Sequence, residues 1–322
     1  MDSVNSFINQ IEKANSIAVF THVNPDGDTL GAATALKHFI ADNFGKTPVL
    51  IINSAVPDMY KFLPGIDDAV HNTEVGKDEI FDLAIAIDVA AKDRMGYSLK
   101  FFDNAKSSIN IDHHVTNCNF GVLNYVEPDA SSASEVLYKM IKQTDSELSA
   151  NAATCLYTGI CTDTGNFKFD NTTSEVLLIA GELAKAGAKP SAISTAVYGS
   201  KPKEMVMLAA YTVNNAKFSK DGKIVYSVIT QEDMQKFKAK NEYTEGIVEM
   251  LKEIKTAEFA ILFKEINKDQ TKVSMRAKTL DSTKIAEEFG GGGHKFASGC
   301  TINRPCTIAV EKFLKRVEEC LG

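Results

Sequence analysis

Apolar segments of this chain end repeatedly in acidic side chains, and this pattern constrains the fold most strongly. The segment Ser108–Ile111 runs directly into Asp112-His113-His114, and the segment Phe81–Ile87 ends at Asp88. Short apolar segments that alternate with helix-length amphipathic ones are typical of βαβ units and a mostly parallel sheet. Because the carboxyl ends of parallel strands meet at one edge of a sheet, we expect these acidic clusters to lie close together.

Two further clusters follow the same rule. His22, Asp26 and Asp28 come after an apolar segment at 16–21, and the predicted helix 150–160 leads into a predicted loop that carries Asp163. Taken singly, each carboxylate is explained equally well as a helix cap or an Asx-turn. Their joint occurrence at the ends of apolar segments favours a multinuclear metal site.

The ligand types indicate which metal such a site would hold. Oxygen-rich ligands with two imidazoles disfavour a thiolate zinc site and suit Mn²⁺ or Mg²⁺, with the imidazoles tilting the choice toward Mn²⁺. Two such cations ~3.5–4 Å apart can hold a hydroxide and clamp a phosphoryl group, which predicts phosphate ester hydrolysis. Two imidazoles and four carboxylates, drawn from His22, Asp26, Asp28, Asp88, the run Asp112-His113-His114 and Asp163, would supply six ligands.

The order of predicted elements indicates two domains, for which 322 residues are sufficient. Glycine and proline interrupt the helical pattern near 187–202, and strands alternate with helices on both sides of this region. We therefore predict an α/β chain with its active site in the cleft between two domains. The first is a doubly wound, mostly parallel sheet domain at 1–186, followed by a linker at 187–205 and a smaller α+β domain at 206–322.

Specific segments carry this prediction. In the first domain, strands are expected at 16–21, 49–52, 81–87 and 108–111, and helices at 4–14, 29–43, 134–142 and 150–160. In the second domain, strands are expected at 223–229, 259–266 and 272–277, and helices at 245–254, 282–289 and 310–320.

Charge divides unevenly between the two halves. Residues 1–190 hold 14 basic and 25 acidic residues, whereas residues 191–322 hold 21 basic and 17 acidic ones. An acidic half suits metal cations and a mildly basic half suits a polyanion, although ordinary surface variation explains the charge equally well. No apolar run approaches the ~18–20 residues of a membrane span, and no secretory signal is apparent. The six cysteines lack a C-x-x-C pair, so we expect a cytoplasmic protein without membrane association.

A glycine-rich motif in the second half is a candidate substrate-binding site. Gly290, Gly291, Gly292 and Gly293 precede His294. Backbone without Cβ atoms can approach a phosphate closely and point its N–H groups at it. Arg276, on a predicted strand, offers a planar fork for the same purpose. A flexible surface turn is the alternative interpretation of the glycines.

Together these motifs resemble the DHH phosphoesterase family. The family's motifs correspond to His22-Val23-Asn24-Pro25-Asp26-Gly27-Asp28, to Asp88, to Asp112-His113-His114 and to Thr162-Asp163-Thr164-Gly165. The C-terminal part resembles the DHH-associated domain through Val273-Ser274-Met275-Arg276-Ala277-Lys278 and Gly290-Gly291-Gly292-Gly293-His294. The resemblance covers nearly the whole chain, and the two-domain length is similar to the NrnA type of nanoRNase, which also removes the 3′-phosphate from pAp (3′-phosphoadenosine 5′-phosphate).

The resemblance implies a role for each motif residue. One metal would be held by His22, Asp26 and Asp88, and a second by Asp28, Asp88, His113 and Asp163, so that Asp88 bridges the two. Asp112 would orient the imidazoles, and His114 would face the scissile phosphate. Arg276, Gly291, Gly292, Gly293 and His294 would bind the substrate.

The expected activity is therefore a two-metal, Mn²⁺-dependent phosphoesterase, with Mg²⁺ as the alternative ion. Its expected substrates are short single-stranded RNA or DNA oligonucleotides of about two to five nucleotides and pAp. Hydrolysis of cyclic di-AMP or its linear product pApA is the alternative, and a non-catalytic nucleic-acid-binding module is an alternative of another class. A homodimer is one expected assembly.

Overall fold

The chain forms two units, 1–200 and 201–322, in a computed structural model that describes residues 2–144 and 146–321. The division falls inside the connection expected at 187–205. Within that connection, helix α7 (Pro190–Ser194) and the π-helical turn η3 (Thr195–Gly199) belong to the first unit. Across the described residues, no helix combines the length and apolar character that crossing a membrane requires.

The first unit is built on a six-stranded sheet in the order β3-β2-β1-β4-β5-β6, with every neighbouring pair parallel. The chain extends the sheet from β1 toward β3, then crosses back and extends it from β4 toward β6. This reversal makes the carboxyl ends of β1 and β4 the topological switch point, where open α/β sheets bind ligands. The strands are β1 (Ile17–Phe20), β2 (Val49–Ile52), β3 (Val70–His71), β4 (Leu83–Ile87), β5 (Ser107–Asp112) and β6 (Leu123–Val126).

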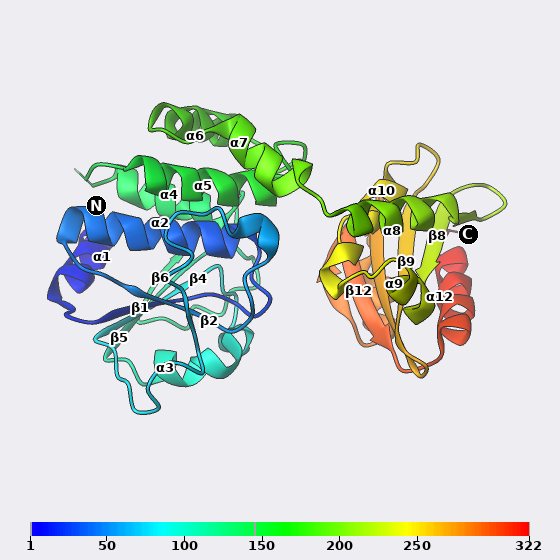
Figure 1. Cartoon of the computed structure of the whole chain (residues 1–322), viewed down its shortest axis with the longest axis horizontal. Coiled ribbons are helices and arrows are strands. Elements are labelled where there is room, and N and C mark those ends of the chain that lie inside the picture. Colours follow the sequence, from blue (N-terminus) through cyan, green and yellow to red (C-terminus); the bar gives the residue numbers. More distant parts are fainter. Residues whose placement is uncertain (1, 145, 322) are drawn as a thin grey trace. The chain divides into compact units, whose positions relative to one another are not determined.

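Helices cover both faces of this sheet, which confirms the expected doubly wound α/β fold. Ile17 and Val19 of β1 face one core, whereas Ala18 and Phe20 face the other. Helices α2, α4 and α5 lie on one side of the sheet and α3 on the other (Figure 1). The helices of this unit are α1 (Asp2–Lys13), α2 (Gly27–Phe44), η1 (Asp58–Tyr60), η2 (Lys92–Ser98), α3 (Leu99–Asp103), α4 (Ala133–Lys142), α5 (Ala150–Asp163) and α6 (Ser174–Lys185), besides α7 and η3.

In the first unit, two expected boundaries were wrong and two strands were missed. Helix α2 begins at Gly27 rather than at residue 29, because Asp26 caps it. Helix α5 continues through residues 161–163, so Asp163 is its last residue and does not lie in a loop. Strands β3 and β6 were not expected, since both are short and only partly buried and therefore lack a continuous apolar run.

Glycines set the distance between α2 and α5. A Cβ atom on Gly31 of α2 would lie 2.6 Å from the carbonyl oxygen of Cys155 and 2.9 Å from the nitrogen of Gly159, both in α5. A Cβ atom on Gly27 would lie 2.4 Å from the Thr162 side chain. Because only glycine permits this approach, the first turn of α2 lies beside the last turn of α5.

The second unit contains a mixed six-stranded sheet in the order β11-β12-β10-β9-β8-β7, in which β8 and β9 are parallel and the other pairs antiparallel. Its strands are β7 (Lys217–Phe218), β8 (Ile224–Ile229), β9 (Phe259–Asn267), β10 (Gln270–Ala277), β11 (Gly292–His294) and β12 (Ala297–Ile302). Its helices are α8 (Lys203–Asn214), α9 (Gln231–Lys236), η4 (Asn241–Thr244), α10 (Ile247–Lys252), α11 (Thr283–Glu288) and α12 (Cys306–Leu321). This arrangement confirms a smaller α+β unit.

Each face of the second sheet has its own apolar core. Phe263, Val273 and Met275 belong to the core that includes α11 and α12. Ala260 and Leu262 belong to the core that includes α8, α9 and α10. Alternate residues of β9 therefore face opposite cores, as strand geometry requires.

Candidate metal centre

The first group of candidate ligands follows two adjacent strands, β1 and β4. Strands β1, β4 and β5 lie side by side and parallel, so the residues that follow them meet at one edge. His22 Nε2 lies 3.4 Å from Asp88 Oδ2 and 3.5 Å from Asp26 Oδ2. Potential ligand atoms of these three residues all lie within 4.8 Å of one another.

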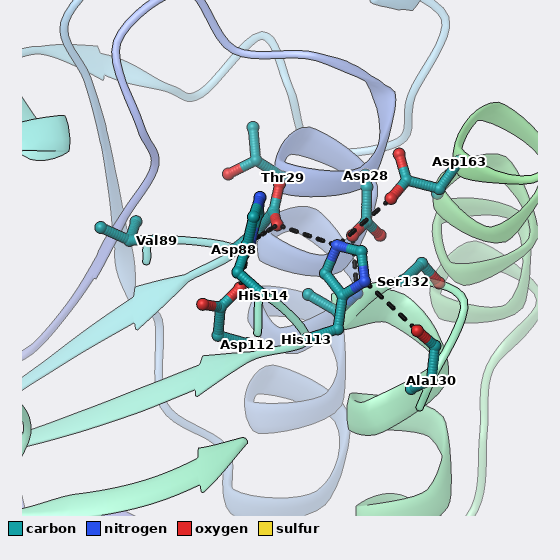
Figure 2. A network of polar contacts seen from close by, with 12 residues as sticks. Asp28, Thr29, Asp88, Val89, Asp112, His113, His114, Ala130, Ser132 and Asp163 are labelled. Atoms are coloured by element: carbon teal, nitrogen blue, oxygen red, sulfur yellow. Dashed lines mark hydrogen bonds and ion pairs between the residues drawn. The ribbon is translucent and has the colours of Figure 1, made fainter. Parts of the chain in front are cut away.

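A second group lies next to the first. His113 Nε2 is 3.3 Å from Asp163 Oδ2 and 3.6 Å from Asp88 Oδ1, and ligand atoms of Asp28, His113 and Asp163 lie within 4.8 Å of one another. Figure 2 shows the His113 ring among these carboxylates, with Asp28 on α2 and Asp163 on α5. One oxygen of Asp88 is directed to each group, so Asp88 connects them.

The backbone at Asp88 is held in an unusual conformation. Its φ of 58° lies in the left-handed region that non-glycine residues seldom adopt. A hydrogen bond from its N–H to the carbonyl oxygen of Ile111 (2.9 Å) fixes this turn on the neighbouring strand. Asp88 Oδ1 is buried and has no hydrogen-bond partner among the described atoms. A buried carboxylate oxygen without a donor fits a cation.

Asp26 serves the helix and the site at the same time. Its Oδ1 accepts hydrogen bonds from the N–H groups of Asp28 and Thr29, both at 3.1 Å, and thereby caps α2. Its Oδ2 is the oxygen that faces His22. The helix-cap interpretation and the ligand interpretation of this aspartate are therefore compatible.

The N-terminus of α4 holds Asp28. Its Oδ2 accepts from the N–H of Ala133 at 2.6 Å, and its Oδ1 accepts from the N–H of Ser134 at 3.0 Å. Unpaired N–H groups and the helix dipole favour a negative charge at this position. The carboxylate is thus fixed although it is fully buried.

Hydrogen bonds to the backbone orient the two candidate imidazole ligands. His22 Nδ1 bonds to the carbonyl oxygen of Val23 (2.8 Å), and His113 Nδ1 to that of Ala130 (3.3 Å). In the neutral ring, donation from Nδ1 leaves Nε2 unprotonated, and this neutral form is the one that binds a metal.

Asp112 and His114 lie against these groups: His114 Nδ1 is 3.5 Å from Asp88 Oδ1, and potential ligand atoms of Asp88, Asp112, His113 and His114 lie within 4.8 Å of one another. His114 Nδ1 lies 2.8 Å from Asp112 Oδ1. Asn117 donates to Asp112 Oδ2 (2.5 Å) and to Asn110 Oδ1 (2.8 Å). Asn117 was missed by the sequence reasoning. The one available signal was a polar residue shortly after the Asp-His-His run, which is too common to be specific.

The electrostatics of the site fit a cation. Burial, and then the negative charge of Asp28, raise the pKa of Asp88 to about 7. Burial and the neighbouring carboxylates also raise the pKa of Asp163 well above its usual range. Burial opposes protonation of His22, but Asp26 and Asp88 outweigh it and raise the pKa of His22 to about 10. Carboxylates crowded into a buried site repel one another, and divalent cations would remove that repulsion.

The candidate substrate-binding site lies in the second unit. A cavity of about 510 Å³ is lined by Lys272, Ser274 and Arg276 of β10 together with Gly290–Gly292 and part of β12. The three β10 residues alternate along the strand and share one face. Of these residues, Arg276, Gly291 and Gly292 were predicted from the sequence as substrate-binding, whereas Lys272, Ser274 and the β12 residues were not.

The glycine positions of this motif differ in how much room they leave for a side chain. A Cβ atom on Gly291 would lie 2.1 Å from the carbonyl oxygen of Gly299, and one on Gly293 would lie 2.5 Å from that of Ala297. These two are needed for packing against β12, whereas Gly292 faces open space. The backbone of His294 lies in β11, and its side chain lies outside the described part of the structure.

Comparisons with known proteins agree with this architecture. Residues 16–160 match the DHH family, N-terminal domain, and residues 221–322 match the DHHA1 domain. The chain is 30% identical over 299 residues to a probable bifunctional oligoribonuclease and PAP phosphatase NrnA of Streptococcus mutans, covering 93% of both chains. It is also 30% identical over 311 residues to the bifunctional oligoribonuclease and PAP phosphatase NrnA of Thermus thermophilus, covering 94% of this chain and 89% of that protein.

A solved structure shares the whole fold. The exopolyphosphatase-related protein of Bacteroides fragilis is 28% identical, with a TM-score of 0.92, and the match covers 99% of this chain and 96% of that one. The chain therefore belongs to the DHH family of phosphoesterases, within which it is NrnA-like and a hydrolase of phosphoester bonds.

Proposed function

We propose that this hydrolase is manganese-dependent and acts on oligonucleotides of about two to five nucleotides and on pAp. The observation that supports this most is the pair of ligand groups connected by Asp88, in a chain similar over nine-tenths of its length to proteins named bifunctional oligoribonuclease and PAP phosphatase. Two divalent cations, when bound there, would supply an activated water and neutralise charge on the phosphate.

The ligand assignment follows from the two groups. His22, Asp26 and Asp88 would hold one cation, and Asp28, Asp88, His113 and Asp163 the other. Oxygen donors with two imidazoles suit Mn²⁺, with Mg²⁺ as the alternative.

His114 is the proposed proton donor to the leaving oxygen. Its hydrogen bond to Asp112 raises its pKa, with burial opposing, so the ring stays protonated to a higher pH. Asn117 holds Asp112 from the other side, which orients the pair. A protonated imidazole near the scissile bond is an efficient general acid.

A substrate panel tests this function. Purified protein would be offered pAp, pApA, cyclic di-AMP and RNA of about two to five nucleotides with Mn²⁺, with Mg²⁺ and after chelation. We expect the fastest turnover with Mn²⁺ on the short RNAs and pAp. Faster turnover of cyclic di-AMP or pApA would support the cyclic-dinucleotide alternative instead, and binding without turnover would support the binding module.

Two variants on one helix separate the site from the fold. Asp28→Asn should abolish turnover, because it removes a ligand charge; its single oxygen can accept from only one of the two α4 N–H groups, so the melting temperature is measured beside turnover. Asp42→Asn changes an exposed carboxylate on the same helix and should leave turnover unchanged. Normal turnover by Asp28→Asn would contradict the proposed site. The cytoplasmic location and the homodimer stay predictions.

A further inference from the structure

Glu249, on α10 in the second unit, contacts the candidate substrate-binding arginine. Arg276 Nε donates to Glu249 Oε1 at 2.9 Å, and Arg276 Nη2 lies 2.7 Å from the same oxygen. Arg276 Nη1 donates to the carbonyl oxygen of Met275 at 3.0 Å. Neither the sequence motifs nor the comparisons assign a role to this glutamate.

These contacts leave one part of the guanidinium available. The group carries five N–H donors in a rigid fork, and the side edge formed by Nε and Nη2 is occupied by Glu249. One N–H on each terminal nitrogen has no partner among the described atoms. The end of Arg276 therefore remains a two-pronged donor, which is the geometry that binds a phosphate bidentately.

The scaffold behind Glu249 is rigid. Ile247, Val248 and Leu251 of α10 are buried in the core on this face of the sheet. Glu249 Oε2 is buried and has no hydrogen-bond partner among the described atoms, so the contacts to Arg276 are made by Oε1 alone. It also lines a cavity of about 380 Å³ with Lys264, Lys272, Ser274 and Arg276.

Stability does not account for this pair. The Arg276 side chain is 27% exposed and that of Glu249 is 40% exposed, and ion pairs at such positions contribute little to folding. The ion pair also neutralises the charge of Arg276, the arginine of the candidate substrate-binding site. This would weaken anion binding at a site that relied on general electrostatic attraction. What the pair does provide is a fixed direction for the guanidinium.

We propose that Glu249 is a positioning residue that fixes which edge of Arg276 faces the nucleotide. By occupying the side edge, it presents the end of the fork to a phosphate group. By neutralising the charge of Arg276, it makes the arginine's own contribution depend on a correctly placed phosphate, whereas Lys264 and Lys272 supply general positive charge to the cavity. This inference rests on the proposed function, in which Arg276 binds the substrate.

Kinetics and direct binding test the inference together. For Glu249→Ala we expect KM for pAp to rise at least fivefold while kcat stays within twofold of wild type. Glu249→Gln keeps an oxygen that can accept from Nε, so its KM should stay within twofold. Glu253→Ala, an exposed glutamate one turn further on, is the matched control and should behave as wild type. In the Arg276→Ala background, Glu249→Ala should have no additional effect.

Binding of AMP and adenosine to chelated protein, measured by calorimetry, is independent of turnover. Glu249→Ala should weaken AMP binding at least fivefold and leave adenosine binding unchanged. An unchanged KM, equal losses in kcat and KM with a lower melting temperature, or additive effects with Arg276→Ala would each overturn the inference. If wild type binds AMP but hydrolyses no phosphoester, the proposed function fails, whereas the calorimetric comparison still decides the role of Glu249.

Discussion

Replacing Gly31 by alanine should disturb the site from a distance. The added Cβ would lie 2.6 Å from the carbonyl oxygen of Cys155, where ordinary contacts begin near 3.4 Å. Both neighbours of this Cβ, Cys155 and Gly159, contribute backbone atoms that cannot rotate away. Helices α2 and α5 would therefore have to separate by up to about 0.8 Å, a typical overpacking strain.

The size of the effect follows from two opposing contributions. Overpacking destabilises by about 1–3 kcal/mol, and the better helix propensity of alanine returns about 1 kcal/mol. A net loss of up to about 2 kcal/mol corresponds to a melting temperature up to about 8 °C lower for a unit of this size. Because α2 carries Asp28 and α5 carries Asp163, misplacement by a fraction of an ångström should also lower kcat/KM by about tenfold or more.

Gly181 provides the matched control. It lies exposed in α6, and nothing lies within 4 Å of the position its Cβ would take. Gly181→Ala should therefore raise the free energy of unfolding by about 0.5–1 kcal/mol and leave kcat/KM unchanged. Urea unfolding and pAp turnover would be measured for both variants. A Gly31→Ala protein as stable and as active as wild type would refute the packing argument.

Three further predictions concern the charges of the site. The pKa of Asp88 is raised from 3.8 to about 7, by burial first and then by Asp28, so metal-free protein should lose stability as the pH rises from about 4 through 7. Asp88→Asn should reduce this pH-dependent loss of stability and abolish turnover. Thermal melts of chelated protein and activity assays would measure the two effects. A pH dependence of stability identical to that of wild type would count against the raised pKa of Asp88. Mn²⁺ should raise the melting temperature of wild type at pH 8 but not that of Asp88→Asn, and calorimetry should find two bound ions per chain rather than one. Burial opposes ionisation of Asp112, but His114 and Asn117 hold the pKa of Asp112 below its usual range. Asn117→Ala should therefore raise the pKa of Asp112 and move the acid limb of the pH profile of kcat to higher pH. An acid limb that does not move would exclude a role for Asn117 in holding Asp112 ionised.

Features that are continuous in sequence could be predicted. The apolar run that ends at Asp88 gave β4, a strand of five fully buried residues inside a parallel sheet. The Asp-His-His run was expected at the end of a strand, and β5 does end at Asp112. Residues 70–71 and 123–126 form edge-side strands that the sequence did not indicate, because pairing with neighbours and not hydrophobicity makes them strands.

The meeting of Asp28 with Asp163 has a different origin. Both lie on helices, and no periodicity in either segment indicates that the first turn of α2 faces the last turn of α5. What brings them together is the close approach of the two helices that Gly27 and Gly31 of α2 allow, and each glycine taken alone predicts only a weaker helix. Ala133 and Ser134 then fix Asp28 through backbone N–H groups, whose identity as donors is independent of their side chains. Donors that belong to the backbone leave no trace in a sequence, so this part of the site becomes visible only once the packing of the helices is known.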